Sequence, residues 1–283
     1  MAQLLFFHGT GRVSQEDEAL VREVLQPRML ARAILSTYEL QFIRWVDEAV
    51  DPPWSSLSVS PSLPPRYQGE YLAQASRGLM NDGTEDWTQL ASELESGDAV
   101  GAFVWQNAVT ELGKRHRVKI MNGFSAFVQS IVLYMREAEA VQKSITNAIR
   151  AVAADEDIVV VGHSLGGMAA VDVLSNPTTY DLLDGRKVKL LVTVGSQAPW
   201  VYYLRGLSSL RPENPAVRPF SPWLNIYDEN DLLSFCAAGV FADAVDVVDE
   251  PIEQGMPFPA AHTNYFQFDG VYDLIEKKLQ HLA

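Results

Sequence analysis

Cysteine is almost absent from this sequence of 283 residues, in which Cys236 is the single example. A disulfide within the chain is therefore impossible, and nothing in the sequence indicates an oxidising compartment. The sequence also lacks a CxxC pair and any cluster of histidine with cysteine. It therefore predicts no metal site of the zinc type.

Positive charge is scarce as well. Lys and Arg number 22 against 36 Asp and Glu, which gives a formal net charge of −14. Binding to phosphates needs clustered Lys and Arg, so this balance argues against nucleic acid as a partner. It also disfavours electrostatic docking on anionic membranes. We interpret the acidic surplus as a solubilising surface.

Long hydrophobic runs are missing too. No window approaches the roughly 18 uninterrupted apolar residues of a membrane span, so we expect no transmembrane segment. The N-terminus carries no positive side chain before the short apolar run 4–7, which is unlike a signal peptide. A cytoplasmic location is the expectation. The length suits a single α/β domain over 1–283 that carries an insertion.

One stretch carries a recognisable chemical pattern, residues 158–168, with the sequence IVVVGHSLGGM. Its apolar, mostly β-branched start predicts a strand that is buried on both faces. The strand leads into Gly162-His163-Ser164-Leu165-Gly166, after which a helix-forming series begins. This is a G-x-S-x-G pattern between a strand and a helix, and it predicts that Ser164 is a nucleophile on a tight turn.

The remaining chain alternates apolar strands with amphipathic segments. Apolar residues recur at steps of three and four over 124–152, which predicts a long helix packed on a sheet. Such alternation indicates an α/β fold with a mostly parallel sheet and helices on both faces. The other expected strands are 3–7, 99–105, 187–194, 223–227 and 244–248, and 271–282 is expected to be a closing helix.

Two irregular segments interrupt this pattern. A capping-box pattern at 36–39 and the apolar residues Leu40, Ile43, Val46 and Val50 predict a helix. A loop rich in proline and serine follows. We therefore expect an inserted helical cap over about 38–95. The proline-rich, aromatic residues 197–222 are expected to form a second loop insertion over the site.

A serine nucleophile needs a base, and the chain offers five histidines. His163 adjoins the serine but should leave the turn in another direction. His8 belongs to a glycine loop, His116 lies among basic residues, and His281 lies in the last turn of the closing helix. His262, in a loop after the last strand, is therefore the predicted base.

The base needs an orienting acid, and two aspartates follow the strand 223–227. Asp228 comes directly after the strand, where an aspartate commonly bonds its own turn. Asp231 lies further along the loop and is better placed to reach a histidine above the sheet edge. We favour Asp231 over Asp228, which gives the chain order Ser164, Asp231, His262.

A developing oxyanion needs two backbone N–H donors. We expect the first from Leu165, the residue after the nucleophile. The second is expected from Thr10, because the loop His8-Gly9-Thr10-Gly11 allows the backbone to approach a substrate closely.

These segments together resemble the α/β-hydrolase superfamily, and in detail its lipase-type serine hydrolases. The resemblance implies an α/β-hydrolase fold in which the first strand of this chain corresponds to the third strand of the family. The usual opening hairpin is then missing or supplied elsewhere. It also implies hydrolysis of carboxylic esters without a metal or other cofactor. The similar segments are 7–11, 162–167, 191–196 and 230–233, with Asp231 and His262.

The sequence thus predicts an esterase or lipase that acts through an acyl-enzyme on Ser164, with a small-molecule or lipid ester as substrate. Trp200 and Tyr203 are candidates for an apolar acyl site, with plain core and cap packing as the alternative. The same triad could serve a thioesterase, an amidase or an acyltransferase. The alternative from a different functional class is a binding module that does not turn over a substrate.

Overall fold

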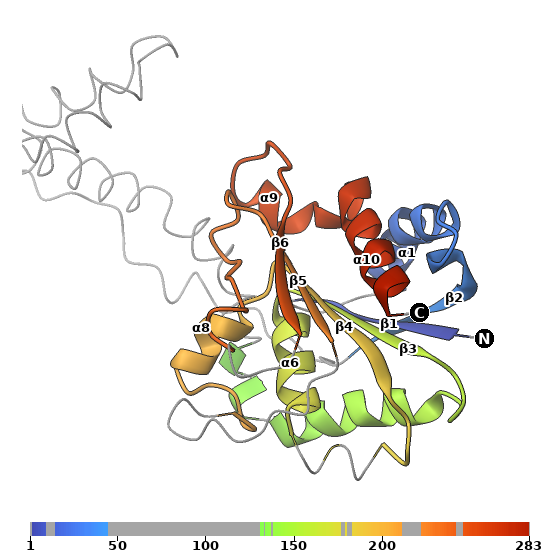
Figure 1. Ribbon diagram of the computed structural model, residues 1–283. Coiled ribbons are helices and arrows are strands. Elements are labelled where there is room, and N and C mark those ends of the chain that lie inside the picture. The colour runs from blue at the N-terminus through green and yellow to red at the C-terminus, as the bar shows by residue number, and fades with distance from the viewer. Residues whose placement is uncertain are drawn as a thin grey trace, which may run out of the picture. The chain divides into compact units, whose positions relative to one another are not determined.

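The computed structural model is built around one six-stranded sheet, in which every neighbouring pair of strands is parallel (Figure 1). The strand order is β2-β1-β3-β4-β5-β6. The strands are β1 (Ala2–Phe7), β2 (Tyr38–Ile43), β3 (Ile158–His163), β4 (Val188–Val194), β5 (Trp223–Tyr227) and β6 (Val247–Pro251). The structure describes residues 2–9, 15–44, 131–176 except 133 and 137, 179, 183–210, 222–241 and 246–282.

Helices cover both faces of the sheet, because the central strands are apolar on both sides. In β3 every residue is buried, and successive side chains join different apolar clusters. Val160 belongs to the cluster under one face, whereas Val159 and Val161 belong to the other. This alternation is what a strand buried on both faces produces. The predicted α/β class with a mostly parallel sheet is therefore confirmed.

Different helices cover the two faces of the sheet (Figure 1). One cluster includes side chains of α1 (Gln15–Leu30) and α10 (Asp269–His281), with the short helix η1 (Leu35–Thr37) nearby. The other cluster includes α6 (Leu165–Leu174) and the helix over 131–151, the described part of the long amphipathic pattern. Within the described part of the chain, no helix is long and apolar enough to cross a membrane.

The prediction of a helix from residue 40 onward is wrong for residues 40–43. Residues Tyr38–Ile43 form β2, which pairs in parallel with β1 over its whole length. Tyr38 and Leu40 are buried while Glu39 between them is exposed. Pairing with β1 therefore selected the alternating pattern over the helical spacing. The expected cap at 38–95 thus begins inside the sheet, and its part from residue 45 lies outside the described residues.

The second predicted insertion, 197–222, does not begin as a loop. It opens with α8 (Ala198–Tyr203), a short helix with a proline in its first turn. Residues 211–221 lie outside the described residues, as does the expected strand 99–105. The last expected strand, 244–248, is observed slightly later in the chain as β6.

Candidate active site

Ser164 occupies the turn between β3 and α6. Its backbone has φ 53° and ψ −125°, a conformation that non-glycine residues seldom adopt. The side chain is almost completely buried. A Cβ on Gly166 would lie 2.3 Å from the carbonyl oxygen of Phe7, so the chain leaving β1 lies directly against this turn. A strained turn of this kind presents a serine side chain above the carboxyl edge of the sheet.

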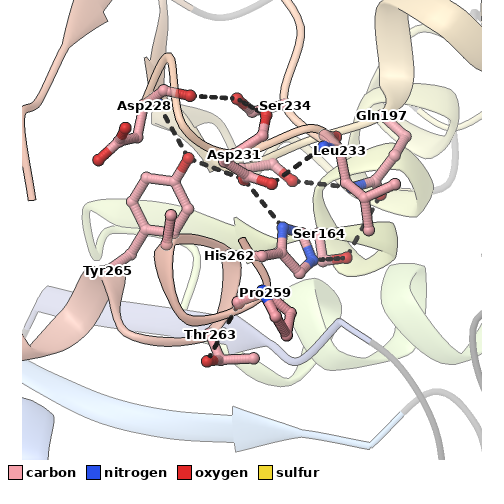
Figure 2. Close-up of polar contacts among 12 residues, drawn as sticks. Ser164, Gln197, Asp228, Asp231, Leu233, Ser234, Pro259, His262, Thr263 and Tyr265 are labelled. Carbon is pink, nitrogen blue, oxygen red and sulfur yellow. Dashed lines mark hydrogen bonds and ion pairs between the residues drawn. The ribbon is translucent and has the colours of Figure 1, made fainter. Parts of the chain in front are cut away.

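His262 contacts the serine from another loop at the same edge. It lies in α9 (Ala260–Thr263), a short helix that follows β6. Its Nε2 is 2.9 Å from Ser164 Oγ, and its Nδ1 is 2.9 Å from Asp231 Oδ2 (Figure 2). The Asp231 side chain is fully buried, and its carboxylate can only accept when ionised. Nδ1 therefore carries a hydrogen, and Nε2 is left to accept the hydroxyl proton of Ser164.

Of the two aspartates weighed from the sequence, Asp231 is the one beside His262. Asp228 accepts the backbone N–H of Asn230 at 2.8 Å and that of Gln254 at 3.0 Å. Each of its carboxylate oxygens thus accepts a backbone N–H, and the bond from Asn230 is the turn-type bond expected at this position. Asp231 makes a similar bond with Oδ1, to Leu233 N–H at 2.9 Å, which leaves Oδ2 for the imidazole.

Tyr265 is a member of this cluster that sequence reasoning missed. Its hydroxyl donates to Asp231 Oδ2 at 2.9 Å and accepts the N–H of Asp228 at 3.0 Å. Burial raises the pKa of Tyr265 far above its usual range, and the Asp231 charge acts in the same direction. The phenol therefore stays protonated and remains a donor. Tyr265 is one of ten tyrosines, and its sequence neighbourhood carries no signal for this role.

His163 contacts the backbone of His262. Its Nε2 is 2.8 Å from the backbone carbonyl oxygen of His262, and the two rings are 5.2 Å apart. Burial lowers the pKa of His163 well below its ordinary value, and the rings of His262 and His8 add to this effect. The imidazole is therefore neutral and its Nε2–H donates to that carbonyl. Ser164 Oγ instead contacts His262 Nε2, so the two neighbouring side chains meet different parts of His262.

Gln197 is a second residue that sequence reasoning missed. It follows β4 and precedes α8, and its side chain is completely buried. Its Oε1 lies 3.3 Å from Ser164 Oγ, while its Nε2 donates to the carbonyl oxygens of Gly195 and Leu233 at 2.9 and 2.8 Å (Figure 2). Ser164 Oγ therefore has a second neighbour besides His262.

Gly195 provides the space in which these groups meet. It has φ +59°, a left-handed conformation that favours glycine. A Cβ at this position would lie 2.8 Å from Tyr265 Cε2 and 3.0 Å from Asp231 Oδ2. The absence of a side chain here allows the acid and the tyrosine to pack against the end of β4.

One of the two predicted oxyanion donors, Leu165, lies at the start of α6. Leu165 is the first residue of α6, where a backbone N–H has no partner within the helix. Thr10 lies outside the described residues, although the neighbouring Gly9 is described. A Cβ on Gly9 would lie 2.6 Å from Ser164 Cβ, so the backbone at Gly9 approaches Ser164 closely.

The two aromatic candidates from the sequence both lie on α8. Trp200 is partly exposed and stacks on Phe235, with ring centroids 5.9 Å apart. Tyr203 is 62% exposed and contacts the ring of Tyr202. Phe235 belongs to the segment after β5 that also carries Asp231, so Trp200 packs against the loop of the candidate acid.

No group of His, Cys, Asp or Glu suited to holding a metal ion is found among the residues that the structure describes.

Comparisons with known proteins add little to this geometry. No family model matches the sequence, and no curated protein matches it. Two solved structures of an esterase from the archaeon Pyrobaculum calidifontis are similar at 14% and 16% identity, each with a TM-score of 0.30. Each match covers 50% of this chain, and it spans 59% and 60% of the respective esterase chains.

Proposed function

We propose that this protein is a serine hydrolase that cleaves carboxylic esters through an acyl-enzyme on Ser164. The observation that supports this proposal is the pair of 2.9 Å contacts that join Ser164, His262 and Asp231. A serine on a strained turn, a base within hydrogen-bond reach and an acid behind the base are the three parts that nucleophilic catalysis requires. The proposed fold is the α/β-hydrolase fold, with these residues on loops at the carboxyl ends of the parallel strands.

The chemistry follows from the direction of each contact. Ser164 Oγ attacks the ester carbonyl carbon while His262 Nε2 takes its proton, and Asp231 stabilises the imidazolium that forms. The imidazolium then gives the proton to the leaving alcohol, which leaves an acyl group on Oγ. Water repeats the sequence: it loses a proton to Nε2, attacks the acyl carbon and releases the acid, and Oγ recovers the proton.

The oxyanion of both tetrahedral intermediates needs donors that are already in place. The Leu165 N–H, at the start of α6, is the first proposed donor. We assign the second to Thr10, because the adjoining Gly9 approaches the nucleophile so closely. A helix N-terminus adds the favourable end of its dipole at the same point.

Trp200 and Tyr203 are proposed to contact the acyl chain of the substrate. Trp200→Ala should then lower kcat/KM for long-chain esters while leaving acetyl esters nearly unchanged. A uniform change across chain lengths would instead mean that Trp200 only packs against Phe235. Matched ester, thioester and amide substrates distinguish an esterase from a thioesterase or an amidase, which use the same geometry.

The decisive experiment is a panel of p-nitrophenyl esters from acetyl to palmitoyl, run with the wild type and with Ser164→Ala. We expect Ser164→Ala to lower turnover by on the order of a million-fold. Ser36→Ala, in the exposed turn before β2, is the control and should keep full activity. Activity that survives in Ser164→Ala would contradict the mechanism. A folded wild type that neither turns over esters nor reacts with a fluorophosphonate would point to a binding module.

A further inference from the structure

The amide of Gln197 can face Ser164 in only one orientation. Its Nε2 lies against two carbonyl oxygens, those of Gly195 and Leu233, and each of them can only accept. The two amide hydrogens are therefore both used by the backbone. Oε1 is left facing Ser164 Oγ at 3.3 Å, in a side chain with no solvent exposure. The nucleophile thus lies between two acceptors, His262 Nε2 and Gln197 Oε1 (Figure 2).

A serine hydroxyl has one hydrogen, so it can donate to only one of these acceptors at a time. Transfer of that proton during attack requires the bond to His262 Nε2, which is the shorter contact. Once the acyl-enzyme has formed, Oγ is an ester oxygen with no hydrogen. Gln197 Oε1 then has no donor from the serine, and a buried acceptor without a donor is costly.

A water molecule can satisfy both acceptors at this stage. Nε2 and Oε1 lie 2.9 and 3.3 Å from the same atom, the one that carries the acyl group, and a water has one hydrogen for each of these two acceptors. Such a water lies beside the acyl carbon, which is bonded to that shared atom. The contact to His262 Nε2 is the one through which the water loses its proton.

We propose that Gln197 is a further catalytic residue, which holds the second hydrogen of the water that cleaves the acyl-enzyme. This inference rests on the proposed function. In the step, the water gives one proton to Nε2 and its oxygen bonds to the acyl carbon. The bond between that carbon and Oγ breaks, and Oγ takes the proton back from Nε2. Gln197 keeps the other hydrogen in a hydrogen bond throughout and exchanges no proton.

The same geometry discriminates between acyl acceptors. An alcohol has one hydroxyl hydrogen, and it must go to His262 Nε2 for attack to occur. Gln197 Oε1 then stays without a donor, whereas with water it is satisfied. Gln197 therefore favours hydrolysis over transfer to an alcohol, a choice that the triad alone does not make.

The test uses p-nitrophenyl acetate in water containing methanol, with the wild type and Gln197→Met. The ratio of methyl acetate to acetate is set by how each acyl-enzyme reacts, so it does not depend on the folded fraction. We expect Gln197→Met to raise this ratio about tenfold, because hydrolysis loses the hydrogen bond and methanolysis does not. The rate of fluorophosphonate labelling at Ser164 should change by less than about threefold, since labelling needs no water.

Gln254→Met is the matched control. Gln254 is also a buried glutamine whose Nε2 donates to a backbone carbonyl, that of Ala261, but it does not contact Ser164. Its product ratio should equal that of the wild type. Gln197→Leu repeats the test if the methionine variant does not accumulate. An unchanged ratio in both Gln197 variants, or equal losses in labelling and hydrolysis, would overturn the inference. A wild type that neither hydrolyses the ester nor labels would instead contradict the proposed function.

Discussion

The hydroxyl of Tyr265 donates a 2.9 Å hydrogen bond to Asp231 Oδ2, the same carboxylate oxygen that lies 2.9 Å from His262 Nδ1. Two donors therefore share one oxygen of the proposed acid. A hydrogen bond from a phenol withdraws part of the carboxylate charge from the imidazole and fixes the position of that oxygen. We therefore expect Tyr265 to be a positioning residue, which acts on the proposed base through Asp231.

Tyr265→Phe removes this donor with little change of shape. The carboxylate then exerts its full charge on His262 and stabilises the imidazolium, so the acid limb of the kcat/KM profile should move to higher pH. Because the position of Asp231 Oδ2 is no longer fixed by this hydrogen bond, we expect kcat to fall about three- to tenfold with KM nearly unchanged. The Asp228 N–H loses its acceptor, which should lower the free energy of unfolding by about 1–3 kcal/mol. Activity against pH and urea unfolding measure the two effects.

Tyr272→Phe is the control for this substitution. Tyr272 is also a buried tyrosine whose hydroxyl donates at 2.8 Å, but its acceptor is the carbonyl oxygen of Phe266. It should lose stability while keeping the wild-type pH profile. If both variants keep that profile, Tyr265 has a structural role only.

Gly195→Ala should disrupt the site without replacing any of its functional side chains. The added Cβ would collide with Tyr265 and Asp231, and displacement of reacting groups by about 1 Å costs on the order of a hundredfold in rate. Gly185→Ala is a matched control, because Gly185 also has a positive φ of 80° but nothing lies within 4 Å of a Cβ there. Ester turnover per folded molecule measures the difference. Equal losses in the two variants would mean that backbone strain, and not the collision, is responsible.

The contacts among Ser164, Asp231 and His262 were predictable because these residues follow strand ends. Ser164 is marked by glycines between a strand and a helix, and Asp231 follows a clear strand. Parallel strands bring such loops together at one edge, so chain order alone suggested which residues meet. Tyr265 does not follow a strand directly, and Gln197 follows β4 but belongs to no recognised catalytic pattern. Their contacts depend on the orientation of a short 3-10 helix and of one side-chain amide relative to Ser164 and Asp231. Such an orientation produces no recognisable spacing of residues in the sequence.

The error at β2 has a comparable physical cause. Leu40 and Ile43 fit a helical stripe behind a capping-box pattern, while Tyr38, Leu40 and Phe42 also fit a strand that alternates. Short apolar segments satisfy both patterns. The edge of β1 decided between them, because unpaired backbone groups of a buried strand need a partner. That requirement is a property of the whole sheet and not of residues 38–43.

Asp172 should matter for stability rather than for chemistry. This completely buried carboxylate on α6 accepts the N–H groups of Ser208 and Ser209 at 2.8 and 2.7 Å, and it also bonds the hydroxyl of Tyr134. Burial raises the pKa of Tyr134 well above its usual range, with the Asp172 charge adding to it, so that hydroxyl stays a donor. Asp172→Asn turns an NH₂ toward one of these donors.

We expect Asp172→Asn to lower the free energy of unfolding by about 2–4 kcal/mol, measured by urea titration. Asp155→Asn, at an exposed turn, should change it by less than about 0.5 kcal/mol. Fluorophosphonate labelling of the folded fraction should stay at the wild-type rate in both. A loss of labelling without a loss of stability would instead assign Asp172 a role in the site.

His163 should make stability depend on pH. Burial holds its pKa in the folded protein well below 6.5, whereas the unfolded chain titrates near about 6.5. Between these two values the unfolded state binds a proton that the folded state does not, so the free energy of unfolding decreases as pH falls. The contribution of His163 is therefore complete above about pH 6.5 and is lost progressively below it.

His163→Gln removes the titration but keeps an N–H able to reach the carbonyl oxygen of His262. The free energy of unfolding of the wild type, minus that of the variant, should be constant above about pH 6.5 and then fall by up to about 1.4 kcal/mol per pH unit. Urea unfolding of both proteins at about pH 7.5, 6.5 and 5.5 measures this difference. The other titratable groups are the same in both proteins, so their contributions cancel. A difference that stays constant over this range would show that His163 accepts a proton as readily in the folded protein as in the unfolded chain, contrary to the effect of its burial.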